Sequence, residues 1–368
     1  MRVVAALASL AGLGLALLFG TPANAEPWIA VKEGMKCASC HVNATGGGMR
    51  TEYGNLYAQM TLSARQFATD GAANDKPWTG RLNEYVAVGG NLRANANFAD
   101  IPDQDSQFAF DLEETRLYLD FSPLPGRVDI YLDQHIAPGG SFNLEAYARY
   151  WSADHDWYIK AGQMYLPFGL RLEDDSAFIR QTPGINFNTP DTGVEFGWET
   201  ARWSTQIAVS NGTAGGPELD TGKQLSLRSV HVRPGWRAGA SLNVNDTELG
   251  ERNMQNLFAG LRTGPVAWLA EIDFIQDDTF AAGELTQQAG LVEANWLFRK
   301  GHNLKVTAEI LDPNTDIDDD EMNRYSVAWE YFPIPYLQLR LGTRLYDGIP
   351  DEALQNHTLV FLQMHGYF

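Results

Sequence analysis

The chain has 368 residues, a formal net charge of -19 at pH 7 and only two cysteines. A surface this negative repels phosphates, which argues against a nucleic-acid partner and favours cations or cationic proteins as partners. Two cysteines cannot build a disulfide framework. Beyond residue 25 the sequence has no apolar run of about 18 residues, which excludes a helical membrane protein but not a β-barrel.

The first 25 residues have the pattern of a secretory signal peptide. Arg2 precedes an almost wholly apolar stretch from Val3 to Phe19, and Ala23-Asn24-Ala25 supplies a small-x-small cleavage pattern. We expect export and cleavage after Ala25; an uncleaved membrane anchor is the alternative. Exposed thiols rarely stay free in an exported protein, so the two cysteines need an explanation.

Both cysteines belong to one motif, C-A-S-C-H at residues 37–41. C-x-x-C-H is the attachment signature of c-type haem, because two thiols at this spacing reach the two vinyl groups of one porphyrin and the next histidine can ligate the iron. A thioredoxin-like redox pair lacks its βαβ context here, and a zinc site lacks further cysteines. The sequence therefore predicts one covalent haem c, bound by Cys37 and Cys40, with His41 as an axial ligand.

A glycine-rich turn at 43–48 and a helix over about 51–67 follow the motif. Tyr53, Tyr57 and Met60 recur at the spacing of one apolar helix face, which could cover a haem. Methionine opposite histidine raises the potential of a haem, so Met60, or Met49 beside the flexible glycines, is a candidate sixth ligand. Each methionine could equally be an apolar filler.

From about residue 81 the hydrophobic period changes from 3.6 to 2. In residues 127–135, for example, Val128, Ile130 and Leu132 alternate with polar residues, as in a strand with one apolar and one polar face. Counting such segments to the C-terminus gives about sixteen strands. The eighth, near 225–232, is irregular enough to suggest a bulge.

The connections between these strands alternate between tight turns, such as 233–235 and 262–265, and mostly longer loops, such as 166–191, 245–253 and 312–321. This is the pattern of an outer-membrane barrel whose short turns face the periplasm. Tryptophans at the expected membrane interfaces and a last outward face ending in Phe368 agree with it. We therefore predict an all-β fold: a monohaem cytochrome c segment at 26–80, then a transmembrane barrel at 81–368. A soluble exported β-sandwich is the alternative.

The densest acidic cluster lies in one predicted outer loop and comprises Asp316, Asp318, Asp319, Asp320 and Glu321. The short turns lean basic. The outer mouth should therefore attract cations, and carboxylates at this density can bind hard divalent metals through oxygen. The same cluster could instead keep the surface solvated or bind calcium that bridges lipopolysaccharide.

Three histidines fall within or beside the predicted barrel strands. His135 and His357 lie near the outer mouth, and His365 lies near the periplasmic end of the last strand. Any of them could ligate the haem if residues 26–80 enter the barrel, although a lone histidine is more often a lining residue.

One haem motif followed by about sixteen barrel strands resembles the fused outer-membrane cytochrome-porin family, whose best-known members are extracellular ferrous-iron oxidases. Residues 29–41, I-A-V-K-E-G-M-K-C-A-S-C-H, are similar to the family's F-A-R-x-T-G-x-x-C-x-x-C-H. Ala30, Gly34, both cysteines and His41 match, and Ile29, Val31 and Glu33 depart from it. The barrel is also similar to phosphate-selective porins at 162–170, G-Q-M-Y-L-P-F-G-L, although the acidic loops disfavour phosphate.

The resemblance implies a protein of the bacterial outer membrane that moves electrons across it. The donor would be extracellular Fe(II) or another redox compound, the acceptor a periplasmic c-type cytochrome, and residues 26–80 would plug the lumen. Such a protein would act as a ferrous-iron oxidase. The alternatives are a transport porin that carries an accessory or sensing haem, and a barrel that sheathes another cytochrome.

Overall fold

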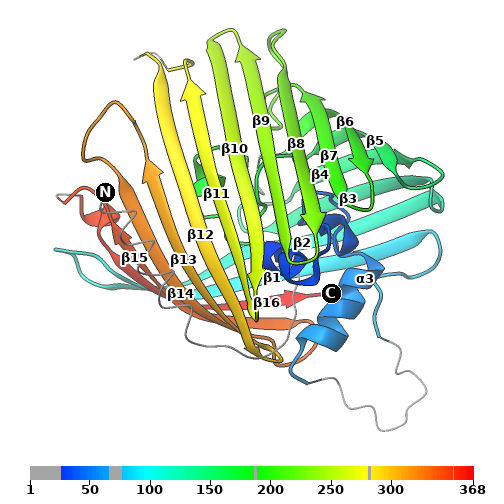
Figure 1. The fold of residues 1–368 in the computed structure, drawn as a ribbon, viewed down its shortest axis with the longest axis horizontal. Coiled ribbons are helices and arrows are strands. Elements are labelled where there is room, and N and C mark those ends of the chain that lie inside the picture. The colour runs from blue at the N-terminus through cyan, green and yellow to red at the C-terminus, as the bar shows by residue number, and fades with distance from the viewer. Residues whose placement is uncertain (1–25, 66–76, 186–188, 281–282, 351) are drawn as a thin grey trace.

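The computed structural model describes residues 26–65, 77–185, 189–280, 283–350 and 352–368, so the predicted signal peptide lies outside the described residues. A closed barrel of sixteen antiparallel strands dominates the fold, with β1 pairing to β16 (Figure 1). The strands are β1 Val86–Asp100, β2 Gln107–Leu124, β3 Val128–Ala137, β4 Phe142–Trp151, β5 Trp157–Met164, β6 Asp191–Glu199, β7 Trp203–Ser210, β8 Gln224–Arg233, β9 Trp236–Thr247, β10 Gly250–Thr263, β11 Val266–Asp277, β12 Leu285–Arg299, β13 His302–Asp312, β14 Met322–Tyr331, β15 Leu337–Asp347 and β16 Thr358–Tyr367. The predicted all-β fold and strand number are confirmed.

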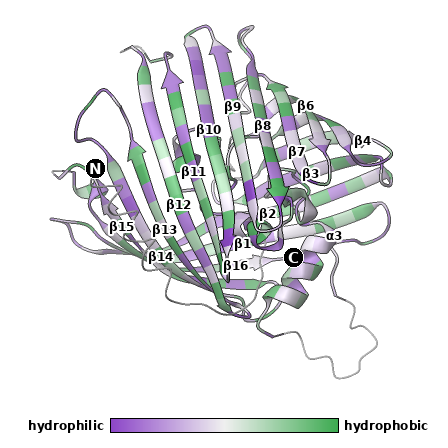
Figure 2. Ribbon diagram, in the orientation of Figure 1, coloured by the Kyte–Doolittle hydropathy of each residue, from purple (hydrophilic) through white to green (hydrophobic). Residues whose placement is uncertain are grey.

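Alternation of side chains between lipid and lumen explains why these segments form barrel strands. On β16, Leu362 and Met364 are exposed on the outer face, whereas Gln363 and His365 are buried inside. Figure 2 shows the same alternation of hydrophobic and hydrophilic residues along β9 to β12. A slip of one residue would turn the polar face toward lipid, so the burial pattern fixes the register.

The bulge predicted near 225–232 is wrong. Strand β8 pairs with β7 and β9 without a register shift, and the shifts lie elsewhere, for example at Arg93/Ala94 on β1. The pattern of β8 looked irregular because Val230 and Val232 are apolar yet face the lumen, where they pack in one cluster with Trp28. Apolar residues on both faces of a strand thus reflect a lumen that is filled.

The predicted tight turns are confirmed at 234–235 and 264–265, but the predicted loop at 245–253 is wrong. There β9 continues to Thr247 and β10 begins at Gly250, so the two strands form one long hairpin. The polar sequence of this segment is compatible with strand because both faces of a hairpin that projects beyond the membrane meet water.

Residues 26–65, here called the plug, lie inside the barrel wall and at its short-turn rim (Figure 1). The plug contains α2 Pro27–Glu33, the 3₁₀ turn η2 Cys37–Ser39, α3 Glu52–Tyr57 and the π-turn η3 Ala58–Leu62. Helix α2 packs against β10 and β11, and the indole of Trp28 is fully buried. Within the described residues, no helix is long and apolar enough to cross a membrane.

A second segment enters the lumen from the opposite rim. The connection from β5 to β6, predicted to be an outer-rim loop, turns inward, and its residues 165–185 are here called the inward loop. Tyr165, Phe168 and Leu170 are at most 3% exposed, and the loop carries the short helix α4 Phe178–Gln181. Its apolar composition, unlike that of the other long loops, is the physical reason for this burial. The last loop carries one further 3₁₀ turn, η4 Ala353–Gln355.

Candidate functional site

The C-x-x-C-H motif folds as one helical turn that follows α2 in the plug. The amides of Cys40 and His41 both donate to the carbonyl oxygen of Cys37, at 3.1 and 3.0 Å. Thr51 ties this turn to α3, because its hydroxyl accepts from the amide of Gly54 and donates to the carbonyl oxygen of Ser39. A Cβ on Gly54 would lie 2.3 Å from the carbonyl oxygen of Cys40, so only glycine permits this approach.

A tight hairpin of residues 41–50 returns the chain past the motif. The amide of Val42 donates to the carbonyl oxygen of Met49, and a backbone bridge joins His41 to Arg50. Three glycines at 46–48 make the turn with positive φ. The hydroxyl of Tyr131 on β3 accepts from the amide of Met49 at 2.9 Å, so the barrel wall supports the hairpin directly.

Charged side chains of the barrel wall hold the backbone of the plug in place. Irregular backbone needs such partners, because carbonyl and amide groups without water or a hydrogen bond are costly. Arg237 donates to the carbonyl oxygen of Met35 at 2.5 Å, Arg262 to that of Lys32 at 3.0 Å and Arg149 to that of Val42 at 2.8 Å. Side-chain pairs add to these contacts: Lys36 with Glu199 at 2.6 Å, Asn43 with Glu145 at 2.6 Å and Glu26 with Arg340 at 2.6 Å.

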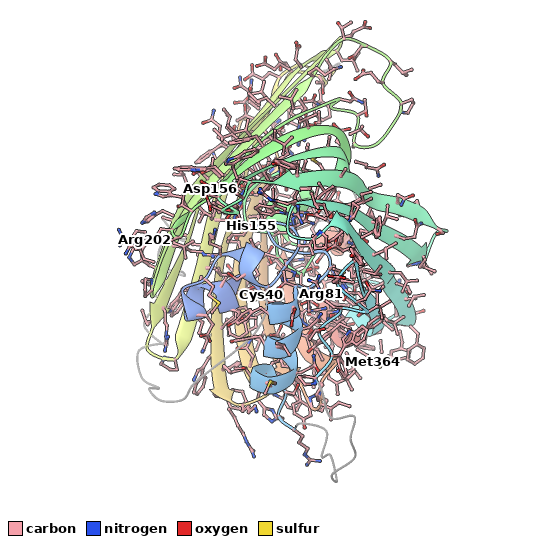
Figure 3. The ribbon with its side chains drawn as sticks, turned by 90° about the vertical axis from the view of Figure 1, so that its right-hand side faces the viewer. Cys40, Arg81, His155, Asp156, Arg202 and Met364 are labelled. Atoms are coloured by element: carbon pink, nitrogen blue, oxygen red, sulfur yellow. The ribbon has the colours of Figure 1, made fainter. Side chains whose placement is uncertain are left out.

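The three motif side chains line one cavity between the plug and the wall. The space between the lining residues, open solvent included, is about 920 Å³. Cys37, Cys40 and His41 contribute from the plug, and the wall contributes residues of β1, β2 and β16. Figure 3 labels Cys40 on the plug, surrounded by strands of the barrel. The arginines among the lining residues, which suit the carboxylates of haem propionates, are Arg50, Arg93, Arg116 and Arg171.

These residues fit a covalent haem better than a metal ion or a redox pair. The two cysteines are not bonded to each other. Burial raises the pKa of the Cys40 thiol to about 12, which disfavours the thiolate that zinc binding or disulfide exchange requires. In the part of the chain that the structure describes, no group of three or more His, Cys, Asp or Glu side chains could hold a metal ion.

Neither methionine proposed as a sixth ligand lines this cavity. Met60 is 52% exposed, and its carbonyl oxygen accepts from Lys300 at the rim. The physical reason is the π-turn at 58–62, which changes the residue spacing and takes Met60 off the face that carries Tyr57. Met49 is buried, but in a separate cluster with Val42 and Tyr131.

The three barrel histidines have different surroundings. His135 lies 2.6 Å from the carbonyl oxygen of Pro138 through Nε2 and stacks on Phe142 near the outer rim. His357 lies 2.8 Å from the carbonyl oxygen of Leu354 and stacks on Tyr346 in the outer region. Neither lines the cavity. His365 does, from the wall side, and is only 4% exposed.

A second cavity, here called the vestibule, lies farther along the same strands. Asn91 and Arg93 of β1 line the first cavity, and Asn95 and Asn97 line the vestibule, whose empty volume is about 1300 Å³. Since β1 runs from the short-turn rim toward the long loops, the vestibule is on the outer side. Arg93 of β1 and Glu173 of the inward loop line both cavities, so the two cavities adjoin at these residues. Sequence reasoning missed this loop, although its apolar residues were a usable signal.

The acidic cluster forms part of the connection between β13 and β14. Asp316, Asp318, Asp319 and Glu321 are exposed and Asp320 is partly buried. None of them belongs to a preformed metal site in the described residues. Attraction of cations by this cluster therefore stays a prediction that rests on charge alone.

The sequence matches no protein-family model and no curated protein. Its fold is similar to solved porins. One is an anion-selective porin from Comamonas acidovorans, at 13% identity and a TM-score of 0.60, covering 77% of this chain and 99% of that one. Another is OprB of Pseudomonas putida, at 8% identity and a TM-score of 0.61, covering 78% and 95%.

A third similar structure is the outer membrane channel DcaP of Acinetobacter baumannii, at 12% identity and a TM-score of 0.57, covering 77% of this chain and 97% of that one. At these identities the likeness shows the fold alone. The chain thus has the fold of a bacterial outer-membrane porin, which supports an outer-membrane location. Its resemblance to cytochrome-porins stays a prediction carried by the N-terminal motif.

Proposed function

We propose that the protein is an outer-membrane monohaem cytochrome-porin that moves electrons from extracellular Fe(II) to a periplasmic c-type cytochrome. Each Fe(II) that is oxidised to Fe(III) gives up one electron, and each electron reduces one cytochrome. The observation that carries the proposal is the position of the C-x-x-C-H motif, which faces a cavity inside the lumen of a porin-fold barrel. An electron carrier must bridge an apolar band about 25 Å tall, and only a group within the barrel could help it do so.

Cys37 and Cys40 would hold the porphyrin through thioether bonds, and His41 would ligate the iron. Bound haem supplies one-electron oxidation and reduction; the protein supplies position, ligands and burial. Arg237, Arg262 and Arg149 fix the plug through its carbonyl oxygens and so orient the motif toward the cavity. Wall and plug both line the cavity, and side chains around a bound haem help to set its potential.

The vestibule and the acidic loop suit the outer half of this function. Carboxylates of the outer loops raise the local concentration of Fe(II), and the vestibule admits it toward Glu173 and Arg93. The ionic groups around the vestibule are mostly paired, for example Arg344 with Asp174 at 2.8 Å and Lys305 with Glu330 at 3.2 Å. At the other rim, basic turns that include Arg202, Arg233 and Arg299 offer a docking surface to an acidic periplasmic cytochrome.

A transport porin with an accessory haem is the second candidate, and the fold comparisons favour it, because the similar structures are porins and channels. The plug argues for electron transfer instead, since it occupies the lumen through which a solute would diffuse. The plug also takes the space that a separate cytochrome would need inside a sheathing barrel.

The two candidates are separated by one preparation of the full chain, made in a host that matures c-type cytochromes and purified in detergent. Electron transfer predicts haem that stays attached on a denaturing gel, is reduced by added Fe(II), and accompanies negligible conductance in planar bilayers. Stable ion conductance without reduction by Fe(II) would establish the transport porin. A protein without covalent haem would overturn both.

A further inference from the structure

We propose that His365 of the barrel wall is the sixth ligand of the haem, opposite His41, so that plug and wall each supply one axial histidine. The inference rests on the proposed attachment of haem at Cys37 and Cys40. All seven histidines of the sequence lie in the described residues. Of these, His41 and His365 line the cavity.

The hydrogen bonds of the His365 ring leave one nitrogen suited to a metal. Nδ1 lies 3.0 Å from Oε1 of Gln338 and 2.9 Å from a carboxylate oxygen of Glu173. Both neighbours are acceptors, so they hold the proton on Nδ1 and leave the lone pair on Nε2. The neighbour of Nε2 is Oδ1 of Asn91, at a long 3.4 Å. Asn91 itself lines the cavity.

This is the arrangement that metal-binding histidines generally have. A ligating imidazole donates its other N–H to a carboxylate or carbonyl, which fixes the ring and raises the basicity of the ligating nitrogen. Glu173 is the carboxylate here and serves as a positioning residue. It comes from the inward loop, where the backbone carbonyl of Glu173 accepts from Arg93 at 3.0 Å and its carboxylate pairs with Arg340 at 3.5 Å. Contacts with the wall and with the inward loop therefore fix the orientation of the His365 imidazole.

Met35 is the methionine that lines the cavity, but it belongs to the same stretch of chain as His41. Arg237 on β9 binds its carbonyl oxygen and holds it on the plug side. His365 lines the same cavity from β16 of the wall. Two histidine ligands predict a low-spin haem without a methionine charge-transfer band, and a lower potential than a His-Met pair would give.

The test is the absorption and electron paramagnetic resonance spectrum of the purified holoprotein, with haem content measured separately as the alkaline pyridine complex. His365→Ala should convert the low-spin haem to a high-spin form while covalent haem per chain stays unchanged. His365→Met should restore a low-spin haem, add a methionine band and raise the potential. The matched controls, His135→Ala and His357→Ala, should leave the spectrum as it is.

The experiment distinguishes failure of the His365 inference from failure of the proposed function. Absence of covalent haem in the parent protein defeats the proposed function and this inference together. Covalent haem whose low-spin spectrum survives His365→Ala overturns the inference alone, as does a methionine band in the parent that Met35→Leu removes. Glu173→Gln should keep the low-spin spectrum but raise the potential, because a neutral partner lowers the basicity of the imidazole. An unchanged potential would show that Glu173 has no positioning role.

Discussion

The plug and the inward loop fill one lumen from opposite rims, and the wall holds them in partly different ways, although arginines bind carbonyl oxygens of both. The plug presents apolar α2 to the wall, where Trp28 and Val31 share a cluster with Phe258. Its carbonyl oxygens accept from arginines. The inward loop is also held through its amides: those of Leu170 and Phe178 donate to the carboxylates of Glu271 and Glu309, at 2.6 and 2.9 Å.

This difference shows how a barrel accommodates irregular backbone. Neither insert forms enough regular structure to satisfy its own polar groups, so the lumenal side chains of the wall must do so. Buried charges in the lumen are therefore not evidence of an open aqueous channel by themselves. The inserts also differ in role, because the plug carries the haem motif and the loop supplies Glu173 beside it.

The largest expected effect is the loss of covalent haem from a barrel that still folds. Replacing both Cys37 and Cys40 by serine should remove all covalent haem, because no other cysteine exists in the chain. The barrel should still fold, since its strands do not depend on the thiols. Haem staining on denaturing gels and heat-modifiable migration measure the two effects. The control Ser39→Ala should keep the haem, and retention of covalent haem by the double variant would refute the attachment site.

The plug should loosen when its apolar anchor is removed. Trp28→Ala deletes a fully buried side chain and should destabilise the packing of α2 by about 3–5 kcal/mol. Protease cleavage within residues 26–65 and conductance in planar bilayers should both increase. Tyr53→Ala, at a residue that is 42% exposed, is the matched control and should change little. Equal behaviour of the two variants would mean that α2 is not anchored by this contact.

The inward loop should open without disturbing haem attachment. Glu271→Ala removes the acceptor of the Leu170 amide and should cost about 1–3 kcal/mol locally. Gly169→Ala tests the same contact sterically: this glycine has φ +47°, and a Cβ would lie 2.0 Å from a carboxylate oxygen of Glu271. Both variants should raise conductance while covalent haem per chain is unchanged. Loss of haem in either would show that the two inserts fold together.

The smallest effect is a pH dependence of the inward loop. Burial raises the pKa of the Asp175 carboxyl to about 6, with Arg93 opposing the rise. The Asp175 carboxyl therefore binds its proton more tightly when the loop is packed in the lumen than when the loop is open. Its contribution to the stability of the packed loop is complete below about pH 4 and is lost as the pH rises through 6. Hydrogen exchange of residues 171–180 should accelerate over that interval. Asp175→Asn should flatten the dependence; a dependence that persists would assign it to another group.

Sequence periodicity was sufficient for the barrel because it reports a local property. Alternation along each strand gave the strand number and the outward face of β16. Alternation failed where the lumenal face of a strand packs against an insert and is therefore apolar. Val230 and Val232 are examples, because their side chains face the plug. Sequence periodicity also placed Met60 on the apolar helix face, whereas a π-turn alters the helical spacing there and Met60 is exposed.

The sequence by itself determined that this chain forms a barrel, and it predicts that Cys37, Cys40 and His41 bind one haem. Both conclusions depend on residues close together along the chain. Only the tertiary structure decided where the motif faces and what lies across from it. The contacts concerned join residues far apart in sequence, such as Asn43 with Glu145 and His365 with Glu173. No local pattern specifies such pairs; closure of the barrel around its two inserts brings them together.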